Sequence, residues 1–481
     1  MDTLLDIWAE LFGTPAIGLD DEFGTLGGTS LLSVRMGLEI HARLGVLVNL
    51  HRAGGSKATV RRLAAIVDAG QSGDTDPQEH EQVADGEGAL VDADLALPLG
   101  EAAPGRAPGT GVLLTGATGF LGAFLLHQLL DTTGHRVYCL VRAASEDEGL
   151  DRLRRAADAY ALPAPDPDRV RVVLGDLHTV EDVCENHRGG ELARQVGHIL
   201  HCAAKVVFTE PYSELRSENV LATLGLLRWA RRHGVRDFGF VSSLAATGPA
   251  LGADGRTLET REQPLDPAQG GYGVGKWVCE RLLERAESEG MRVRVFRPGL
   301  ILGSTRTGAC NPKDMLWRML ASGVATGAHP LDDRPMPMAP VDLVSRAVVD
   351  LLFTPGSAGR AFHLVAPEGY SARRLFGLLG EAGLATEPLS RSDWLTTVAD
   401  RARAGGNDVL TSMALYDLAG HEGADSGVEA EAWQPWLRDS GQRPVPTGAL
   451  LRSALAHLAG KDPGYLELLS GSLVAASDRN E

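Results

Sequence analysis

The chain lacks the sequence features that are typical of secreted and metal-binding proteins. Its five cysteines are odd in number and include no Cys-x-x-Cys pair, so we expect small buried thiols rather than disulfides or a metal site. The N-terminus, Met1-Asp2-Thr3, has no basic segment before its apolar residues, as a secretory signal would have. These absences predict a cytoplasmic protein.

Positive charge is also scarce. The chain has 46 Lys and Arg against 63 Asp and Glu, which gives a formal net charge of -17. Such a surface repels nucleic-acid phosphates unless a large basic patch compensates, and the sequence contains no such patch. We therefore expect no nucleic-acid partner.

One uncharged run, residues 107–130, is long enough to span a bilayer. It contains five glycines, three of them at the spacing of a phosphate-binding turn, so a buried strand, turn and helix explain the run better. We expect no membrane segment.

A length of 481 residues predicts two or three folding units. Composition divides the chain into a helical segment at 1–70, a linker at 71–107, an α/β unit at 108–303 and a mainly helical region at 304–481, which we expect to cap the α/β unit.

The first two segments differ sharply in composition. In residues 1–70, Leu4, Trp8 and Leu11 recur at helical spacing and further helices are expected from Ser30 and over 59–67, so we predict a small four-helix bundle. The linker has nine acidic residues against one basic residue, Arg106, and no aromatic residue. It should be a solvated spacer with an end-to-end distance of roughly 35 Å.

Beyond residue 110, short β-branched runs alternate with longer amphipathic stretches, which predicts a doubly wound parallel sheet with helices on both faces. The expected strands are 111–115, 136–141, 169–174, 197–202, 236–242 and 291–296, and the expected helices between them include 120–131, 147–159, 213–233 and 274–289.

A glycine-rich turn follows the first of these strands. Gly116, Gly119 and Gly122 allow a tight turn, let backbone N–H groups approach a pyrophosphate, and let the next helix lie close to the strand. At the end of the second strand stands Arg142, where a carboxylate would suit a free ribose 2′-hydroxyl. An arginine can instead pair with a 2′-phosphate, which favours NADPH over NADH, although a solvated surface arginine remains the alternative.

A possible reducing site follows in the sequence. Ser243 lies just after a predicted strand, and Tyr272 and Lys276 lie one helical turn apart, so phenol and ammonium share a face. We expect the ammonium to lower the phenol's pKa, Tyr272 to donate a proton to a carbonyl oxygen that receives hydride, and Ser243 to hydrogen-bond that oxygen.

Residues 108 to about 365 resemble an extended short-chain dehydrogenase/reductase of the Rossmann type, and more narrowly the thioester reductase domains of nonribosomal peptide synthetases and carboxylic acid reductases. The matching residues are Thr115, Gly116, Ala117, Thr118, Gly119, Phe120, Leu121, Gly122, Arg142, Arg152, Gly175, Asp176, Leu177, His201, Cys202, Ala203, Ala204, Asn219, Val220, Ser243, Tyr272, Lys276, Arg297, Pro298 and Gly299.

The resemblance implies roles for several of these residues. Arg142 and Arg152 would hold the 2′-phosphate, Asp176 and Leu177 would flank the adenine, and residues Ala203, Ala204 and Lys205 would line the cofactor channel. The catalytic group would be Ser243, Tyr272 and Lys276, of which Tyr272 and Lys276 would also contact the cofactor. For His201 we expect packing at a strand end, because no further metal ligands stand at suitable spacing. For Asp176, a turn or helix cap is the alternative.

Residues 1 to about 68 resemble peptidyl and acyl carrier proteins, on the run Asp21-Glu22-Phe23-Gly24-Thr25-Leu26-Gly27-Gly28-Thr29-Ser30-Leu31-Leu32. The resemblance implies that Ser30 carries 4′-phosphopantetheine at the start of a helix, where the helix dipole favours a phosphodiester. A simple N-capping serine is the alternative.

Together the two resemblances imply NADPH-dependent release of a carrier-bound acyl or peptidyl thioester as an aldehyde, or further as an alcohol, in secondary-metabolite biosynthesis. They imply a phosphopantetheinyl transferase and loading modules as partners, acting in trans or on a longer assembly, and we expect a monomer. The alternatives are a dehydrogenase or epimerase for a diffusible substrate, and a non-catalytic docking module. The sequence leaves the cargo open.

Overall fold

The computed structural model describes residues 1–28, 30–46, 58–72, 86–93, 109–207, 210–248, 251–366, 370–405, 407, 409–410, 413, 427–441 and 447–469. Thr29 and most of the expected linker lie outside these ranges. No described helix is long and apolar enough to cross a membrane.

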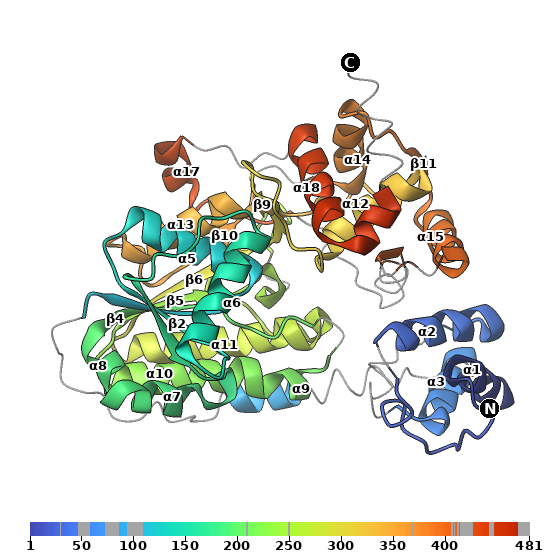
Figure 1. The fold of residues 1–481 in the computed structure, drawn as a ribbon, viewed down its shortest axis with the longest axis horizontal. Coiled ribbons are helices and arrows are strands. Elements are labelled where there is room, and N and C mark those ends of the chain that lie inside the picture. The colour runs from blue at the N-terminus through green and yellow to red at the C-terminus, as the bar shows by residue number, and fades with distance from the viewer. Residues whose placement is uncertain are drawn as a thin grey trace.

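A seven-stranded parallel sheet forms the centre of the larger part of the chain (Figure 1). Its strand order is β10-β6-β5-β4-β1-β2-β3, so the order reverses between β1 and β4. In doubly wound sheets, ligands bind at the carboxyl edge where this reversal occurs. The strands are β1 (Gly111–Thr115), β2 (Val137–Val141), β3 (Val170–Leu174), β4 (Val196–His201), β5 (Asp237–Val241), β6 (Arg292–Pro298) and β10 (Arg360–Leu364).

Helices cover both faces of the sheet because successive strand side chains point to opposite sides. Val112 and Leu114 pack with α5 and α13, whereas Leu113 packs with α10 and α11 on the opposite face. The covering helices are α5 (Phe120–Thr132), α6 (Glu146–Ala159) and α13 (Val341–Phe353) on one face, and α7 (Val180–Asn186), α10 (Ala222–Arg232) and α11 (Gly270–Ser288) on the other. The doubly wound fold predicted from the sequence is confirmed.

The expected end of the sheet unit at residue 303 needs correction. The seventh strand, β10, pairs with β6 from Arg360↔Arg294 to Leu364↔Pro298, and α13 packs against α5. Both elements lie in the region that the sequence analysis placed in the cap. Ala361, Phe362 and Leu364 are buried, so a single short apolar strand after a long helical stretch completes the sheet.

The remaining C-terminal elements form two smaller buried clusters beside the sheet. They are mainly helical, as predicted, and include two small strand pairs, β7 with β9 and β8 with β11. The elements are β7 (Leu300–Leu302), α12 (Met315–Thr326), β8 (Ala328–Pro330), β9 (Met338–Pro340), α14 (Ala372–Glu381), β11 (Glu387–Leu389), α15 (Arg391–Gly405), α17 (Gln434–Ser440) and α18 (Gly448–Lys461).

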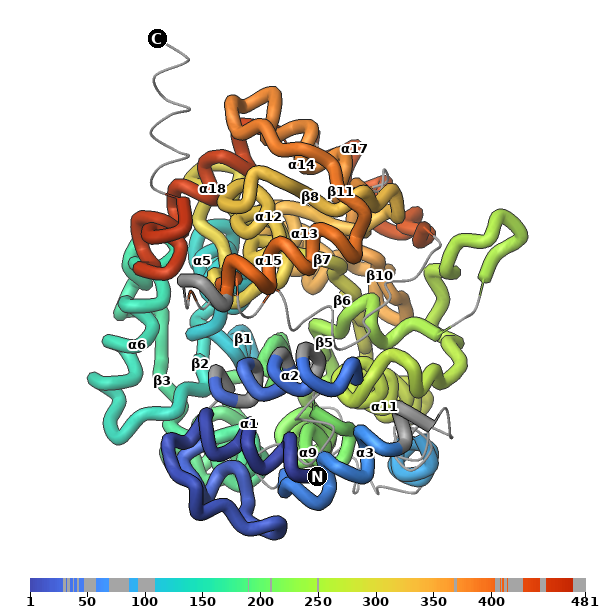
Figure 2. The backbone as a smooth tube through the Cα atoms, turned by 90° about the vertical axis from the view of Figure 1, so that its right-hand side faces the viewer, coloured from blue at the N-terminus to red at the C-terminus, as the bar shows by residue number. Residues whose placement is uncertain are grey.

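The N-terminal segment is a small helical bundle with its own core. Three of the four expected helices lie within the described residues: α1 (Asp2–Phe12), α2 (Ser30–Leu44) and α3 (Val60–Ser72). The rings of Trp8, Phe12 and Phe23 contact one another with centroids 5.3–5.7 Å apart. Figures 1 and 2 both place α2 of this bundle beside α15.

Residues 86–93 depart from the expected solvated linker. They form a short helix, which we call the linker helix, with Ala89 fully buried and Asp92 4% exposed. Ala89 packs in the same core cluster as Tyr212 and Trp277, which belong to the part of the chain that contains the sheet. The sequence did not predict this helix because the segment is acidic. The charge of Asp92 is neutralised by Arg216, which lies 124 residues further along the chain.

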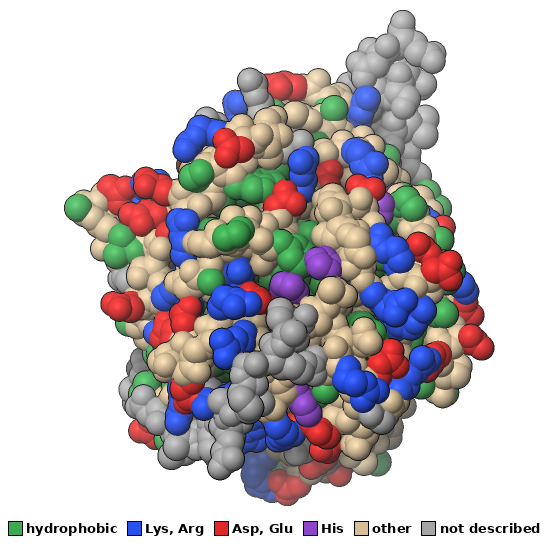
Figure 3. Space-filling model, turned by 90° about the vertical axis from the view of Figure 1, so that its left-hand side faces the viewer, with side chains coloured by type: hydrophobic (Ala, Val, Ile, Leu, Met, Phe, Trp, Pro, Cys, Tyr) green, Lys and Arg blue, Asp and Glu red, His purple; other side chains and the backbone are tan. Residues whose placement is uncertain are grey.

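Charges of both signs are interleaved on the face of the molecule seen in Figure 3. Arginine and lysine side chains on this face alternate with acidic ones instead of forming one continuous basic area.

Candidate active site

The glycine-rich turn between β1 and α5 is too tight for any other residue at two positions. Gly116 has a φ of 81°, and a Cβ there would lie 2.8 Å from the Ala203 nitrogen. A Cβ on Gly122 would lie 1.9 Å from the carbonyl oxygen of Gly116. The turn also closes on itself, since the Gly119 N–H donates to the Gly116 carbonyl at 2.9 Å. The turn from Gly116 to Gly122, which we call the glycine cradle, is therefore held by contacts between backbone atoms.

A threonine hydroxyl holds the neighbouring loop against the cradle. Thr115 Oγ1 accepts hydrogen bonds from the backbone N–H groups of Cys202 (3.2 Å) and Ala203 (3.1 Å) and lies 2.7 Å from His201 Nδ1. The other ring nitrogen of His201 lies 3.1 Å from the Thr223 hydroxyl. Burial lowers the pKa of His201 to about 3, so the imidazole is neutral. The packing role expected for His201 is what its contacts show.

The start of α5 offers unpaired backbone donors to an anion. The N-cap is Gly119, which has no side chain to accept a hydrogen bond from the first N–H groups of the helix. A helix N-terminus without an internal acceptor attracts phosphate through its N–H groups and its dipole. Phe120 anchors the turn by packing against Phe124 and Tyr160, at ring centroid distances of 5.6 and 5.1 Å. The cradle, which includes Thr118 and Leu121, therefore fits a dinucleotide pyrophosphate.

Two arginines gather where β2 ends, at the expected adenine ribose position. Arg142 has a side chain 70% exposed and lies 3.6 Å from an Asp176 carboxylate oxygen. Arg152 reaches back from α6 and donates to the Arg142 carbonyl. The other Asp176 oxygen caps the short helix at Leu177, accepting from the His178 N–H at 3.1 Å. Two guanidinium groups at the end of β2, one exposed and one partly buried, suit a 2′-phosphate.

Asn219 fixes the loop that was expected to line the cofactor channel. Its side chain is 3% exposed, accepts from the Lys205 N–H at 2.7 Å and donates to the Lys205 carbonyl at 3.0 Å. The Lys205 ammonium pairs with Glu210 at 2.7 Å. Asn219 lies in a π-helical turn, Ser217–Leu221, a local widening that is frequent at functional sites. The sequence analysis matched Asn219 without giving it a role.

The three expected catalytic residues come together at the carboxyl end of β5. Ser243 follows this strand and accepts from the Ala245 N–H at 3.1 Å. Tyr272 lies in the first turn of α11, is 7% exposed, and is hydrogen-bonded to Ser243. The Lys276 ammonium donates to the Val241 carbonyl at 2.7 Å and lies 5.8 Å from the centre of the Tyr272 ring.

The expectation that Lys276 lowers the phenol's pKa is wrong for this arrangement. Burial raises the pKa of Tyr272 above its ordinary value, and the hydrogen bond with Ser243 opposes the rise only in part. Burial also lowers the pKa of Lys276. Desolvation dominates both groups because neither side chain reaches bulk water. The phenol is thus held in its protonated, donating form.

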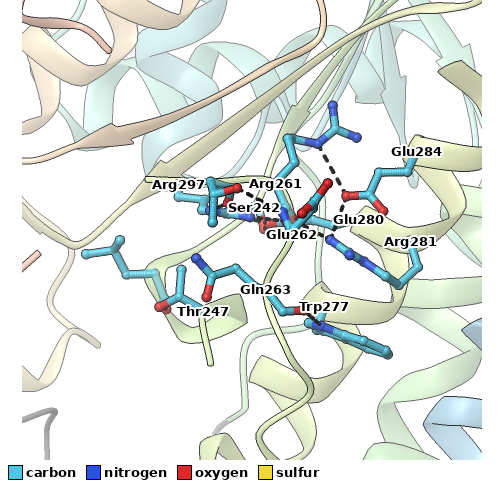
Figure 4. Close-up of polar contacts among 12 residues, drawn as sticks. Ser242, Thr247, Arg261, Glu262, Gln263, Trp277, Glu280, Arg281, Glu284 and Arg297 are labelled. Atoms are coloured by element: carbon cyan, nitrogen blue, oxygen red, sulfur yellow. Dashed lines mark hydrogen bonds and ion pairs between the residues drawn. The ribbon is translucent and has the colours of Figure 1, made fainter. Parts of the chain in front are cut away.

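A buried ion pair joins the middle of α11 to β6 (Figure 4). Glu280 and Arg297 are both fully buried and form a bidentate pair, with Nε–Oε1 at 3.0 Å and Nη2–Oε2 at 2.5 Å. Ser242, which precedes Ser243, donates to Glu280 at 2.5 Å. The sequence signal for Glu280 was available, because it follows Lys276 by one helical turn amid apolar residues.

The carrier motif runs from a loop into the first turn of α2. Ser30 is the first residue of α2, and the turn before it doubles back so that the Gly28 N–H donates to the Phe23 carbonyl at 2.8 Å. A Cβ on Gly28 would lie 2.2 Å from the Phe23 ring. The Ser30 side chain itself lies outside the described features. The backbone thus presents residue 30 at a helix N-terminus, as expected for an attachment site.

The fold and this arrangement of residues define a nicotinamide-dependent reductase of the extended short-chain dehydrogenase/reductase class. A family model described as "Male sterility protein" matches residues 114–348, and a model described as "Phosphopantetheine attachment site" matches residues 2–67. The terminal R domain of the myxalamid PKS-NRPS pathway is 30% identical, with a TM-score of 0.70 over 78% of this chain and 98% of that structure. The chain belongs to the family of terminal reductase domains of nonribosomal peptide synthetases.

Two further similarities extend over most of the chain. A thiolation-reductase di-domain from an archaeal nonribosomal peptide synthetase shares the fold, with a TM-score of 0.73 at 19% identity, over 96% of this chain and 97% of that one. A linear gramicidin synthase protein of Brevibacillus parabrevis is 31% identical over 88% of this chain. The chain spans 8% of that relative's length and 40% of another, the peptide synthetase FrzA of Cladobotryum sp.

Proposed function

We propose that this chain reduces an acyl or peptidyl thioester carried on the phosphopantetheine arm of Ser30 and releases it as an aldehyde. The observation that carries the proposal is the meeting of Ser243, Tyr272 and Lys276 at the end of β5, in the same sheet edge as the glycine cradle. The match of residues 2–67 to a phosphopantetheine attachment site supplies the tether.

Bound NADPH supplies a hydride to the thioester carbonyl carbon, and the protein handles the charge that develops on oxygen. Tyr272 gives its phenolic proton to that oxygen, and the Ser243 hydroxyl donates a hydrogen bond to it. The tetrahedral carbon then loses the pantetheine thiol, and the carbonyl forms again as an aldehyde. With the cofactor bound, Lys276 would hold the nicotinamide ribose, and as a buried cation it would favour negative charge on the substrate's carbonyl oxygen.

Tethering suits this chemistry. A substrate on the chain's own arm meets the site at a high effective concentration, in place of a bimolecular encounter. The same residues could reduce the aldehyde to an alcohol with a second NADPH, because an aldehyde oxygen also needs a proton from Tyr272 and a hydrogen bond from Ser243.

NADPH consumption with an acyl-pantetheine thioester tests the proposal. Wild type should turn over the thioester, and Tyr272→Phe should lose about 10²- to 10⁴-fold in kcat, the usual contribution of a positioned acid. Tyr138→Phe, which removes a buried hydroxyl on β2, should retain activity. Oxidation of a sugar nucleotide or sterol in place of thioester reduction would instead favour a diffusible substrate.

The proposal extends to partners and location. A phosphopantetheinyl transferase must modify Ser30, loading modules must supply the acyl group, and we propose that the chain acts as a monomer. We also propose a cytoplasmic location, which the five free cysteines support: four are buried and Cys202 is half-buried. Intact-protein mass after treatment with a transferase tests the first point, since Ser30→Ala should gain no adduct.

A further inference from the structure

The linker helix (residues 86–93) is attached to the reductase part by one buried carboxylate. Asp92 accepts from the Tyr212 hydroxyl at 2.5 Å and from Arg216 through Nε at 2.5 Å and Nη2 at 2.7 Å. Both partners lie on α9 (Tyr212–Arg216). Bidentate arginine pairs are among the strongest polar contacts in proteins, and here the carboxylate is buried while the Arg216 side chain is 37% exposed. We call these three side chains the Asp92 clamp.

The charge of the clamp is balanced within the contact. Burial raises the pKa of Asp92, but the hydrogen bonds from Arg216 and Tyr212 outweigh this effect. The pKa is therefore below its ordinary value, and the carboxylate stays ionised and paired. Apolar packing adds to the contact, because Ala89 is fully buried in the same core cluster as Tyr212. At the other end of the linker helix, a Cβ on Gly86 would lie 3.3 Å from Pro267.

The clamp rests on the element that positions the expected catalytic phenol. The first turn of α11 lies against the start of α9, and a Cβ on Gly271 would lie 2.4 Å from the Glu210 carbonyl oxygen and from the Tyr212 nitrogen. Gly271 precedes Tyr272 directly. The linker therefore meets the reductase next to the catalytic turn of α11, before the chain enters β1.

This attachment shortens the tether between the carrier and the reductase. From Ser72, the last residue of α3, the chain runs through 14 peptide bonds to Gly86, but through 39 to Gly111 at the start of β1. At most, these paths span about 50 Å and about 140 Å. Effective concentration falls roughly as the -3/2 power of tether length, so the shorter path raises it about fivefold.

We propose that the Asp92 clamp sets the reach of the carrier, so that Ser30 delivers its thioester from an anchor on α9 and not from the start of β1. The proposal rests on the proposed function, because it concerns delivery of the same tethered substrate. It predicts that the clamp matters for substrate on the arm and not for substrate in solution.

Two substrates distinguish this role from a structural one. With an acyl group loaded on Ser30, Asp92→Ala should lower the single-turnover rate of NADPH oxidation about fivefold. With a free acyl-pantetheine thioester, its kcat and KM should equal those of wild type. Glu87→Ala, an exposed carboxylate on the same helix, should change neither rate.

A parallel fall of both rates in Asp92→Ala, or no change in either, would overturn the proposal. If that variant fails to fold, insertions in the wild-type chain test the same claim. Twelve Gly/Ser residues placed between 73 and 85 should lower the rate for the loaded acyl group about 2.5-fold, and the same insertion between 94 and 108 should leave it unchanged. Equal effects of the two insertions would also contradict the clamp. Absence of any thioester reduction by wild type would refute the proposed function instead.

Discussion

Two loops of this chain run through glycines into a helix whose N-terminus is an expected phosphate site, and they are held in different ways. In the reductase, the turn before α5 is fixed by backbone atoms, since the Cβ position of Gly122 falls 1.9 Å from a carbonyl oxygen. In the carrier, the turn before α2 folds over the ring of Phe23, which packs with Trp8 and Phe12.

The difference follows from what each helix end must do. A pyrophosphate is held only by non-covalent contacts, so several N–H groups must be aimed at it and kept there. A phosphopantetheine arm is held by a covalent bond, and its serine has to be reached by a modifying enzyme. The first loop is therefore built into the sheet core, whereas the second packs on one buried residue of the small bundle, Phe23, through both its ring and its carbonyl group.

Among the changes that test this comparison of the two loops, Gly122→Ala should have the largest effect. The new methyl group meets a backbone carbonyl that cannot move without disturbing β1, so we expect a loss of about 2–3 kcal/mol, or roughly 30- to 150-fold, in NADPH affinity. Calorimetry measures this. Gly134→Ala, which meets no atom within 4 Å, is the matched control and should bind normally. Near-normal affinity of Gly122→Ala would remove the contrast between the loops.

A smaller loss is expected from Gly28→Ala in the carrier. The added methyl group displaces the Phe23 ring and crowds the Phe23 carbonyl, so we expect about a tenfold slower phosphopantetheinylation of Ser30, from a strain of about 1–2 kcal/mol. Intact-protein mass over time gives the rate. NADPH affinity should be unchanged in this variant, and Gly122→Ala should be modified at the normal rate. A loss of NADPH affinity in Gly28→Ala, or slower modification of Ser30 in Gly122→Ala, would contradict the independence of the two loops.

Arg142→Ala tests the exposed end of the reductase site. Because the side chain is 70% exposed, its contact with a 2′-phosphate is screened by solvent, and we expect a loss of about 1 kcal/mol, roughly fivefold, in NADPH affinity with none for NADH. Arg154→Ala, an exposed arginine on α6 paired with Asp151, serves as control. Equal affinity of wild type for both nucleotides would contradict the assignment of Arg142.

The pH dependence of turnover should show the smallest effect. Burial lowers the pKa of Lys276 and raises that of Tyr272, so the ammonium is lost first as pH rises, while the phenol still carries its proton. The alkaline limb of kcat/KM should therefore begin below the ordinary pKa of a lysine and persist in Ser243→Ala at a lower overall rate. A limb that starts above the ordinary pKa of tyrosine would contradict this order of titration.

The sequence predicted the sheet and the cofactor cradle well because both depend on local patterns. The apolar strand Gly111–Thr115 and the three glycines fix strand, turn and helix within a dozen residues, and six of the seven strands were expected at nearly their observed positions. The seventh, β10, was missed because one five-residue strand among helices carries little periodicity of its own.

Long-range polar contacts could not be predicted from local patterns. Asp92 looked like one more acid of a solvated linker, and only the fold brings it to Arg216. Arg297 was matched through the family resemblance, but its buried pairing with Glu280, 17 residues earlier in the chain, becomes visible only in the fold. The rise in the pKa of Tyr272 was not predicted for a related reason, since helical spacing gives its proximity to Lys276 but not its burial.

The central claim is that cargo on Ser30 is removed by reduction at Tyr272. We expect that a holo chain loaded with an acyl group, given NADPH, loses the acyl mass from Ser30 as NADPH is oxidised, while loaded Tyr272→Phe keeps the acyl group. Loss of the acyl group without NADPH oxidation, or NADPH oxidation with the acyl group still attached, would contradict the account.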